Sequence, residues 1–148
     1  MFFGIIVYMP PEDKQRLLDY YENSLKEYGD NPKSVHWMDQ KNQEIRFEIL
    51  NKIADLNNKK ILDVGCGLGD LYQFFISKNI GITYTGIDIV PEFIEKAQKS
   101  FPDIKFILKD VIEINEKYDY ILASGVLSFK FKDSKNYYFH LYLHGRRY

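Results

Sequence analysis

The feature that most constrains this chain is a glycine-rich turn between an apolar run and a helix-compatible stretch. Residues 61–71 read ILDVGCGLGDL, with glycines at alternate positions after a short run that contains an acid. Glycine carries no Cβ, so backbone at such a turn can approach a bound ligand closely. A helix that begins after the turn also directs backbone N–H groups at a polar ligand. The order strand, glycine turn, helix therefore predicts a cofactor site.

Composition limits the class of protein. The 148 residues suit a single domain, residues 1–148, which we divide into an N-terminal strand and helical lid (1–58), a cofactor-binding core (59–126) and an aromatic tail (127–148). The 20 basic and 21 acidic residues lack the basic excess of a general nucleic-acid binder. The only cysteine, Cys66, cannot form an internal disulfide and favours a cytoplasmic location. No apolar run approaches the roughly 20 residues of a membrane helix.

Helical spacing dominates the first third of the chain. Proline and acids at 11–13 predict a helix start, and Gly29 ends that helix. A second helix is predicted from about Asp39 to Asn57, and its buried stripe is expected to consist of Ile45, Ile49, Ile53 and Leu56. An edge strand is predicted for the apolar residues 2–8, although these residues could also form a disordered extension or precede a functional start at Met9.

Strand and helix patterns alternate from residue 60 onward. Strands are predicted at 61–64, 82–89, 104–108 and 118–123, and helices at 68–78 and 91–100. This alternation predicts an α/β fold with a Rossmann-like parallel sheet and helices on both faces. Right-handed crossovers then place the carboxyl ends of all strands at one edge, where ligands of such sheets bind.

Polar residues follow each of the four predicted strands. They are Asp63 with the glycine turn, Asp88, Asp110 with Val111, and Ser124 with Gly125. An acid about 20 residues after a glycine turn is placed to hold both hydroxyls of a ribose. Each acid alone could instead cap a helix or be solvated, but the combination of order and spacing indicates a nucleoside-containing cofactor.

With these motifs the chain resembles the class I S-adenosylmethionine-dependent methyltransferases. Residues 61–71, 85–97, 106–111 and 118–125 are similar to the first four motifs of that family, and the preceding helices resemble its two-helix lid. The family's sheet has seven strands, whereas only 24 residues follow Ser124. The resemblance therefore implies a fold that is incomplete relative to the whole family domain.

The resemblance also implies roles for individual residues. Gly65, Cys66 and Gly67 would pass beneath the methionyl part of the cofactor, with Gly69 completing the turn and Asp63 near the ammonium group. Asp88 would hold the ribose, Ile89 would pack on the adenine face, Asp110 and Val111 would bind the adenine edge, and Ser124 would lie near the sulfonium. The product would be S-adenosylhomocysteine.

A nicotinamide cofactor is the alternative that the residues themselves leave open. Its fingerprint is Gly-x-Gly-x-x-Gly, but here the third glycine comes one position early and Asp70 occupies the expected place. Asp63 and Asp70 would repel a pyrophosphate, whereas a sulfonium and an ammonium would tolerate them. The charges therefore favour S-adenosylmethionine over NAD.

The predicted lid supplies the remaining candidates. His36, Trp37 and Tyr21 are candidates for a catalytic role, because an aromatic face attracts a sulfonium and an imidazole can accept a proton. Gln43 and Arg46 could reach the cofactor carboxylate. Ordinary packing or a solvated helix face explains these residues equally simply. No metal is expected, because Asp133 is the only acid after the fourth strand.

These patterns predict a methyltransferase that acts on a small-molecule acceptor by direct methyl displacement. The alternative is a protein that binds S-adenosylmethionine but is catalytically incomplete. Since a fourth strand without further neighbours would be an open edge, we expect a homodimer, a partner subunit or a terminal segment to cover it.

Overall fold

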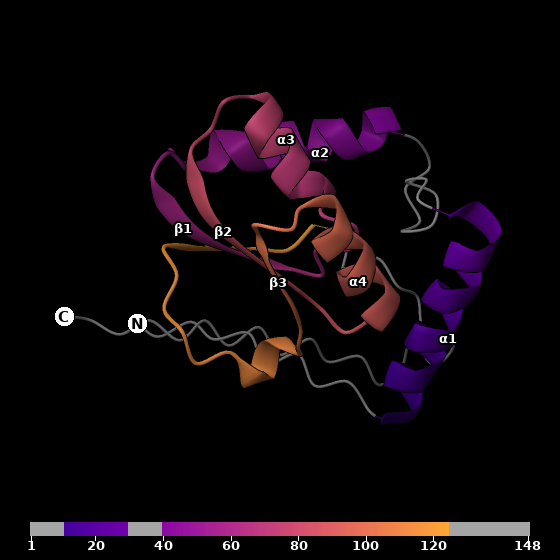
Figure 1. Ribbon diagram of the computed structural model, residues 1–148. Helices are drawn as coiled ribbons and strands as arrows, with labels where there is room; N and C mark the ends of the chain where they lie inside the picture. Colours follow the sequence, from indigo (N-terminus) through magenta and orange to yellow (C-terminus); the bar gives the residue numbers. More distant parts are fainter. Residues whose placement is uncertain (1–10, 30–39, 125–148) are drawn as a thin grey trace, which may run out of the picture.

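The computed structural model describes residues 11–29 and 40–124 (Figure 1). The predicted edge strand at 2–8, the candidates His36 and Trp37, and the tail at 127–148 lie outside the described residues. The elements are, in chain order, α1 (Pro11–Tyr28), α2 (Gln40–Ile53), β1 (Lys59–Val64), α3 (Asp70–Ser77), β2 (Ile82–Asp88), α4 (Pro91–Ser100), β3 (Lys105–Leu108), the 3₁₀ helix η2 (Val111–Glu113) and β4 (Tyr120–Leu122).

The four strands form one parallel sheet in the order β3-β2-β1-β4. The register pairs Asp63 of β1 with Gly86 of β2 and with Leu122 of β4. The predicted Rossmann-like parallel sheet is thus confirmed, and within the described residues it has four strands rather than seven. Because all strands run the same way, Asp63, Asp88, Asp110 and Ser124 fall at or just after the same edge of the sheet.

Helices α2, α3 and α4 cover the sheet through two apolar clusters. Phe47 of α2 and Phe74 and Phe75 of α3 pack on Ile61 of β1. Helix α4 packs on β2 and β3 through a second cluster that contains Ile94, Ala97, Tyr84, Phe106 and Cys66. In Figure 1, α2 and α3 lie above the strands, and the connection with η2 runs below them.

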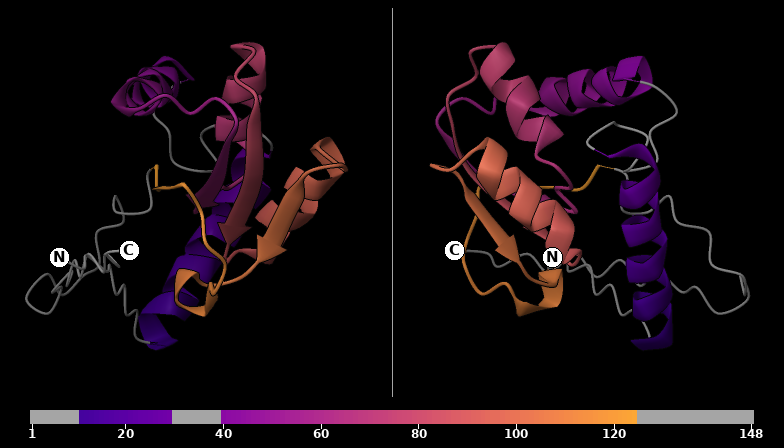
Figure 2. Two further views of the ribbon diagram at one scale, coloured as in Figure 1. Left: turned by 90° about the vertical axis from the view of Figure 1, so that its left-hand side faces the viewer. Right: turned by 45° about the vertical axis from the view of Figure 1, so that its right-hand side comes forward.

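Helix α1 lies beside the start of α4 rather than on the sheet (Figure 2). Its Leu25 is buried with Val90 and Phe93, and Tyr21 meets the Phe93 ring edge-on at a centroid distance of 5.4 Å. Leu68 and Ile89 are partly buried against the same cluster. These two residues come from the glycine turn and the end of β2, so α1 packs directly against the predicted cofactor edge. Within the described residues, no helix has the length and apolar character to span a membrane.

The predicted buried stripe of α2 is wrong. Ile45, Ile49 and Ile53 are 48%, 57% and 69% exposed. Gln43 and Phe47 are buried instead. Residues two positions apart on a helix lie about 200° apart around its axis, so these two sets occupy opposite faces. Leu56 is buried as expected, but it follows the helix and lies in the same apolar cluster as Phe47.

Gly86 makes room for the glycine turn. A Cβ at this position would lie 2.7 Å from the Phe106 ring and 2.9 Å from both Cβ and Sγ of Cys66. Real Cβ atoms do not approach neighbours so closely, and the interior has little space to relax. The absence of a side chain on β2 therefore lets residue 66 of the turn pack onto the strand.

We expect Gly86→Ala to lower the free energy of unfolding by about 1–3 kcal/mol, because the added methyl overpacks the core. Gly81→Ala is the matched control, since its Cβ would meet only Asn58 Oδ1 at 3.9 Å. Urea denaturation of both variants measures the difference. Equal stability of the two variants would show that the Cys66 loop moves away at no cost.

Candidate cofactor-binding site

The glycine turn is tied by its backbone to the end of β2. The N–H groups of Gly65 and Cys66 both donate to the carbonyl oxygen of Ile87, at 2.8 and 3.0 Å. Gly65, Gly67 and Gly69 have φ angles of 71°, 54° and 89°, in the left-handed region that favours glycine. Helix α3 begins at Asp70, later than predicted, because residues 65–69 form this turn.

Asp88 joins the turn to the start of α4. Its carboxylate accepts from the Gly67 N–H at 2.9 Å through Oδ2 and from the Val90 N–H at 3.0 Å through Oδ1. Burial raises the pKa of Asp88 above its usual 3.8, and these backbone donors offset part of that rise. The carboxylate that is predicted to hold a ribose therefore lies directly against the glycine turn.

Asp63 is buried beneath the turn. It is 2% exposed, and Oδ2 accepts a hydrogen bond of 2.5 Å from the Tyr84 hydroxyl. Burial raises the pKa of Asp63 from 3.8 to about 7, the Tyr84 hydrogen bond opposes that rise, and the negative charges of Asp88 and Asp70 add to it. The side chain is thus held in an environment that disfavours its charge.

Asp70 completes a group of three acids around the turn. It begins α3, and its Oδ2 accepts from Gln43 Nε2 of α2 at 2.7 Å. Burial raises the pKa of Asp70 as well. No lysine or arginine within residues 11–29 and 40–124 forms an ion pair with Asp63, Asp70 or Asp88. We call these three residues the acid group; its negative charge is uncompensated in the described part of the chain.

Two predicted cofactor residues also serve the packing of the turn. The Cys66 side chain is 7% exposed in the α4 cluster, and burial raises the pKa of its thiol well above 9.0. A Cβ on Gly69 would come within 2.9 Å of the Phe106 ring. Their side-chain positions therefore face the core, and only their backbone is available to a ligand.

The residues predicted to bind adenine lie at the end of β3. Asp110 caps η2: its Oδ1 accepts from Ile112 N–H at 3.4 Å, and its own N–H donates to Glu113 Oε2 at 2.9 Å. Lys14 of α1 pairs with the Asp110 carboxylate at 3.5 Å. Val111 begins η2 and is partly buried, and so is Ser124 after β4. The cap leaves Asp110 Oδ2 with a partly exposed lysine as its partner.

The lid candidates divide into two groups. Tyr21 of α1 lies close enough to the acid group for the charge of Asp88 to act on it. Burial and that charge raise the pKa of Tyr21 to about 12. Tyr20 is 43% exposed and Arg46 is exposed, whereas Gln43 is buried against Asp70. Gln43 is therefore engaged with the start of α3 rather than with a ligand.

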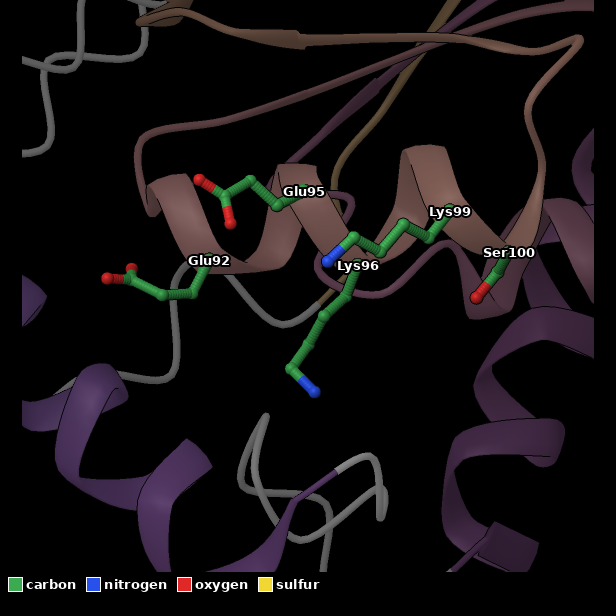
Figure 3. A pocket seen from close by; sticks show the side chains of 5 residues that line it. All are labelled: Glu92, Glu95, Lys96, Lys99 and Ser100. Carbon is green, nitrogen blue, oxygen red and sulfur yellow. The ribbon is translucent and has the colours of Figure 1, made fainter.

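A pocket on the described surface lies away from the glycine turn. It has a volume of about 260 Å³ on the outer side of α4 and is lined by Glu92, Glu95, Lys96, Lys99 and Ser100 (Figure 3). None of the predicted cofactor residues lines it. Four of its five lining side chains are charged and all come from one helix, which gives the pocket no resemblance to a nucleoside site. The described residues contain no group of three or more metal-ligating side chains.

Tyr84 is the site residue that the sequence analysis missed. It lies on the same face of β2 as Gly86 and Asp88, as the alternation of a strand requires, and its hydroxyl meets Asp63 across the β1–β2 pair. The signal was a polar-tipped aromatic two residues before Gly86, in a strand already assigned to the site.

Comparison with known proteins places the chain in a family. Residues 62–142 match the family described as Methyltransferase domain. The chain is 30% identical over 120 residues to malonyl-[acyl-carrier protein] O-methyltransferase of Acetivibrio thermocellus, covering 76% of this chain and 40% of that enzyme. It is 34% identical over 80 residues to a tRNA (guanine-N(7)-)-methyltransferase of Clostridium botulinum, covering 47% and 37%.

A solved structure shows the same fold. Magnesium protoporphyrin IX methyltransferase from Synechocystis, with bound S-adenosylmethionine, superposes with a TM-score of 0.57 at 20% identity, covering 79% of this chain and 64% of that one. The chain belongs to the methyltransferase domain family, which confirms the resemblance drawn from its motifs. It spans about 40% of the length of the curated relatives it matches.

The pKa of Asp63 makes stability depend on pH. Because this pKa is about 7 in the folded protein and 3.8 in the reference state, the folded protein retains a proton that the unfolded chain releases between these values. The free energy of unfolding of the ligand-free protein therefore falls as pH rises through about 4 to 7. Asp63→Asn cannot ionise and still offers Tyr84 an acceptor.

We expect Asp63→Asn to be more stable than the unsubstituted protein at pH 8, by roughly 1–4 kcal/mol, and by less than half as much at pH 5, because only the lower part of the interval between the two pKa values lies below pH 5. Urea denaturation at the two pH values measures this difference. Asp103→Asn, at an exposed loop residue, is the control and should be neutral at both. A stability difference for Asp63→Asn that did not change with pH would contradict a raised pKa at this residue.

Proposed function

We propose that the chain binds S-adenosylmethionine at the glycine turn and serves methyl transfer from it. The observation that carries the proposal is the position of the acid group around the glycine turn. Asp88 accepts a hydrogen bond from the Gly67 N–H of that turn, and Asp63 is buried beneath it. A cofactor with an ammonium and a sulfonium supplies the positive charge that the acid group lacks, whereas a dinucleotide would bring a pyrophosphate against it. The three carboxylates of the acid group therefore fit S-adenosylmethionine better than NAD.

The proposed roles follow from position. The backbone of Gly65, Cys66 and Gly67 would lie beneath the methionyl part, and Asp63 would face the ammonium. Asp88 would exchange its Gly67 contact for the ribose hydroxyls. Ile89, Asp110 and Val111 would enclose the adenine, and Ser124 and Tyr21 would lie toward the reacting end.

When bound, S-adenosylmethionine supplies a methyl group already activated on its sulfonium sulfur. The chain's own residues then have to bind, align and exclude water. Tyr21 keeps its proton well above neutral pH, so it would contribute a neutral aromatic face rather than a base. Among the described residues none is placed as a general base, which suits an acceptor that needs no deprotonation by the protein. His36 and Trp37 remain candidates for a catalytic role beside the sulfonium.

The proposed acceptor is a small molecule. The relatives are named for different acceptors, a malonyl carrier protein and a tRNA, and the neighbouring structure for a porphyrin. The balance of 20 basic and 21 acidic residues supports a non-nucleic-acid acceptor, and the buried, unpaired Cys66 supports a cytoplasmic location.

A second candidate function is binding without turnover. In the described sheet β4 is a three-residue edge strand with Ile121 62% exposed. Such an edge favours a covering partner, and we propose a homodimer, a partner subunit or the chain's own tail for this place. In that case the acceptor half of the site would come from the covering element.

We expect titration calorimetry to detect binding of S-adenosylhomocysteine and no binding of NAD. Asp88→Asn should weaken S-adenosylhomocysteine binding about 10- to 100-fold, because hydrogen bonds to a charged group are lost. Asp103→Asn is the matched control and should bind as the unsubstituted protein does. Binding of NAD without S-adenosylhomocysteine would overturn the cofactor assignment, and full affinity in Asp88→Asn would overturn the ribose role.

Turnover separates the two candidate functions. We expect formation of S-adenosylhomocysteine from S-adenosylmethionine when the chain is incubated with pools of small-molecule acceptors. Bulk tRNA and an acylated carrier protein form two further arms. Product with tRNA alone would replace the small-molecule assignment, and binding without product in any arm would favour the binding function. Asp88→Asn serves as the control for product made by contaminating enzymes.

A further inference from the structure

Tyr84 and Asp63 form a buried polar pair beneath the proposed donor site. The Tyr84 side chain is 5% exposed and Asp63 is 2% exposed, and the hydroxyl donates to Asp63 Oδ2 at 2.5 Å. The structure records no donor to the other oxygen, Oδ1, among the described residues. One carboxylate oxygen is thus fixed and the other is available.

Packing alone does not explain this pair. The Tyr84 ring lies 5.1 Å from the Tyr72 ring and 5.7 Å from the Phe106 ring, contacts that phenylalanine would make equally well. A buried carboxylate is costly unless its charge is compensated, and apolar residues of similar size often replace such groups without loss of stability. The hydroxyl and the carboxylate therefore point to a role in binding.

We infer that Tyr84 is a positioning residue of the methyl-donor site: its hydroxyl fixes Oδ2 of Asp63 and so presents Oδ1 to the ammonium group of the cofactor's methionyl part. The inference rests on the proposed function, because it assumes that this cofactor binds at the glycine turn. The Tyr84 hydroxyl, and not only the Tyr84 ring, then sets the affinity of the site for the amino-acid end of the ligand.

The charges around Asp63 make this role dependent on pH. Asp88 at the end of β2, Asp70 on α3 and the Cys66 thiol of the turn face it together with Tyr84. Burial raises the pKa of Asp63 most, the Tyr84 hydrogen bond lowers it, and the two carboxylates raise it further. Removing the hydroxyl should therefore shift ionisation of Asp63 to higher pH. A ligand with an ammonium group should then bind more weakly near neutral pH.

The test is calorimetric titration with S-adenosylhomocysteine and with 5′-methylthioadenosine, which lacks the amino-acid end, between pH 5.5 and 8. For the unsubstituted protein we expect S-adenosylhomocysteine affinity to rise with pH and methylthioadenosine affinity to stay flat. In Tyr84→Phe, S-adenosylhomocysteine affinity should fall about tenfold or more at pH 7, a loss that narrows toward pH 8, and methylthioadenosine affinity should be unchanged. Tyr72→Phe, in the same aromatic cluster, is the control.

The outcomes separate this inference from the proposed function. If neither ligand binds the unsubstituted protein, the proposed function fails. If both bind and Tyr84→Phe leaves the S-adenosylhomocysteine profile unshifted, or weakens both ligands equally at every pH, the positioning role is overturned. Should Tyr84→Phe not fold, Asp63→Asn decides: the role requires that the pH dependence of the unsubstituted protein disappear in it, and persistence of that dependence overturns the role.

Discussion

The docking of the glycine turn onto the end of β2 is the constraint on which the rest of the site depends. Two successive N–H groups of the turn share the Ile87 carbonyl, and a third, from Gly67, meets Asp88 one residue later. This arrangement needs Gly86, because any side chain there would strike Cys66. The Ile87 carbonyl, the Asp88 carboxylate and the missing side chain at Gly86 thus all constrain the backbone of residues 65–67. The path of this backbone fixes where α3 starts and where the acid group gathers.

The acid group is a local cost to the fold. Burial raises the pKa of each of its three carboxylates. The negative charges of Asp88 and Asp70 raise the pKa of Asp63 further. The donors it receives are a tyrosine hydroxyl, a glutamine amide and backbone N–H groups, all neutral. Neutral donors orient a carboxylate without cancelling its charge. The cationic cofactor that we propose would supply the missing positive charge, which would account for an uncompensated arrangement in an otherwise apolar core.

Much of the fold could be predicted from local pattern. Helix α4 was bounded correctly because Pro91 starts it and its apolar residues follow one period. The strands were found because short apolar runs are followed within two residues by glycine, aspartate or serine. The face of α2 was mispredicted because this helix carries two apolar stripes. Only contact with α3, where Phe47 meets Phe74 and Gln43 meets Asp70, decides which stripe is buried. The Tyr84–Asp63 pair joins residues 21 apart in the sequence, so the position of Tyr84 in its strand marks it as a candidate but does not identify its partner.

The two halves of the proposed site differ in how they are built. The donor side is set by hydrogen bonds from the backbone of the turn to Ile87 and Asp88 at the end of β2. The side formed by α1 depends on apolar packing of Leu25 and Tyr21 onto Phe93, joined by the partly exposed Lys14–Asp110 pair. An exposed ion pair of this kind contributes little. Helix α1 is therefore held at the cofactor edge through side-chain packing, whereas the turn is held on β2 through its backbone.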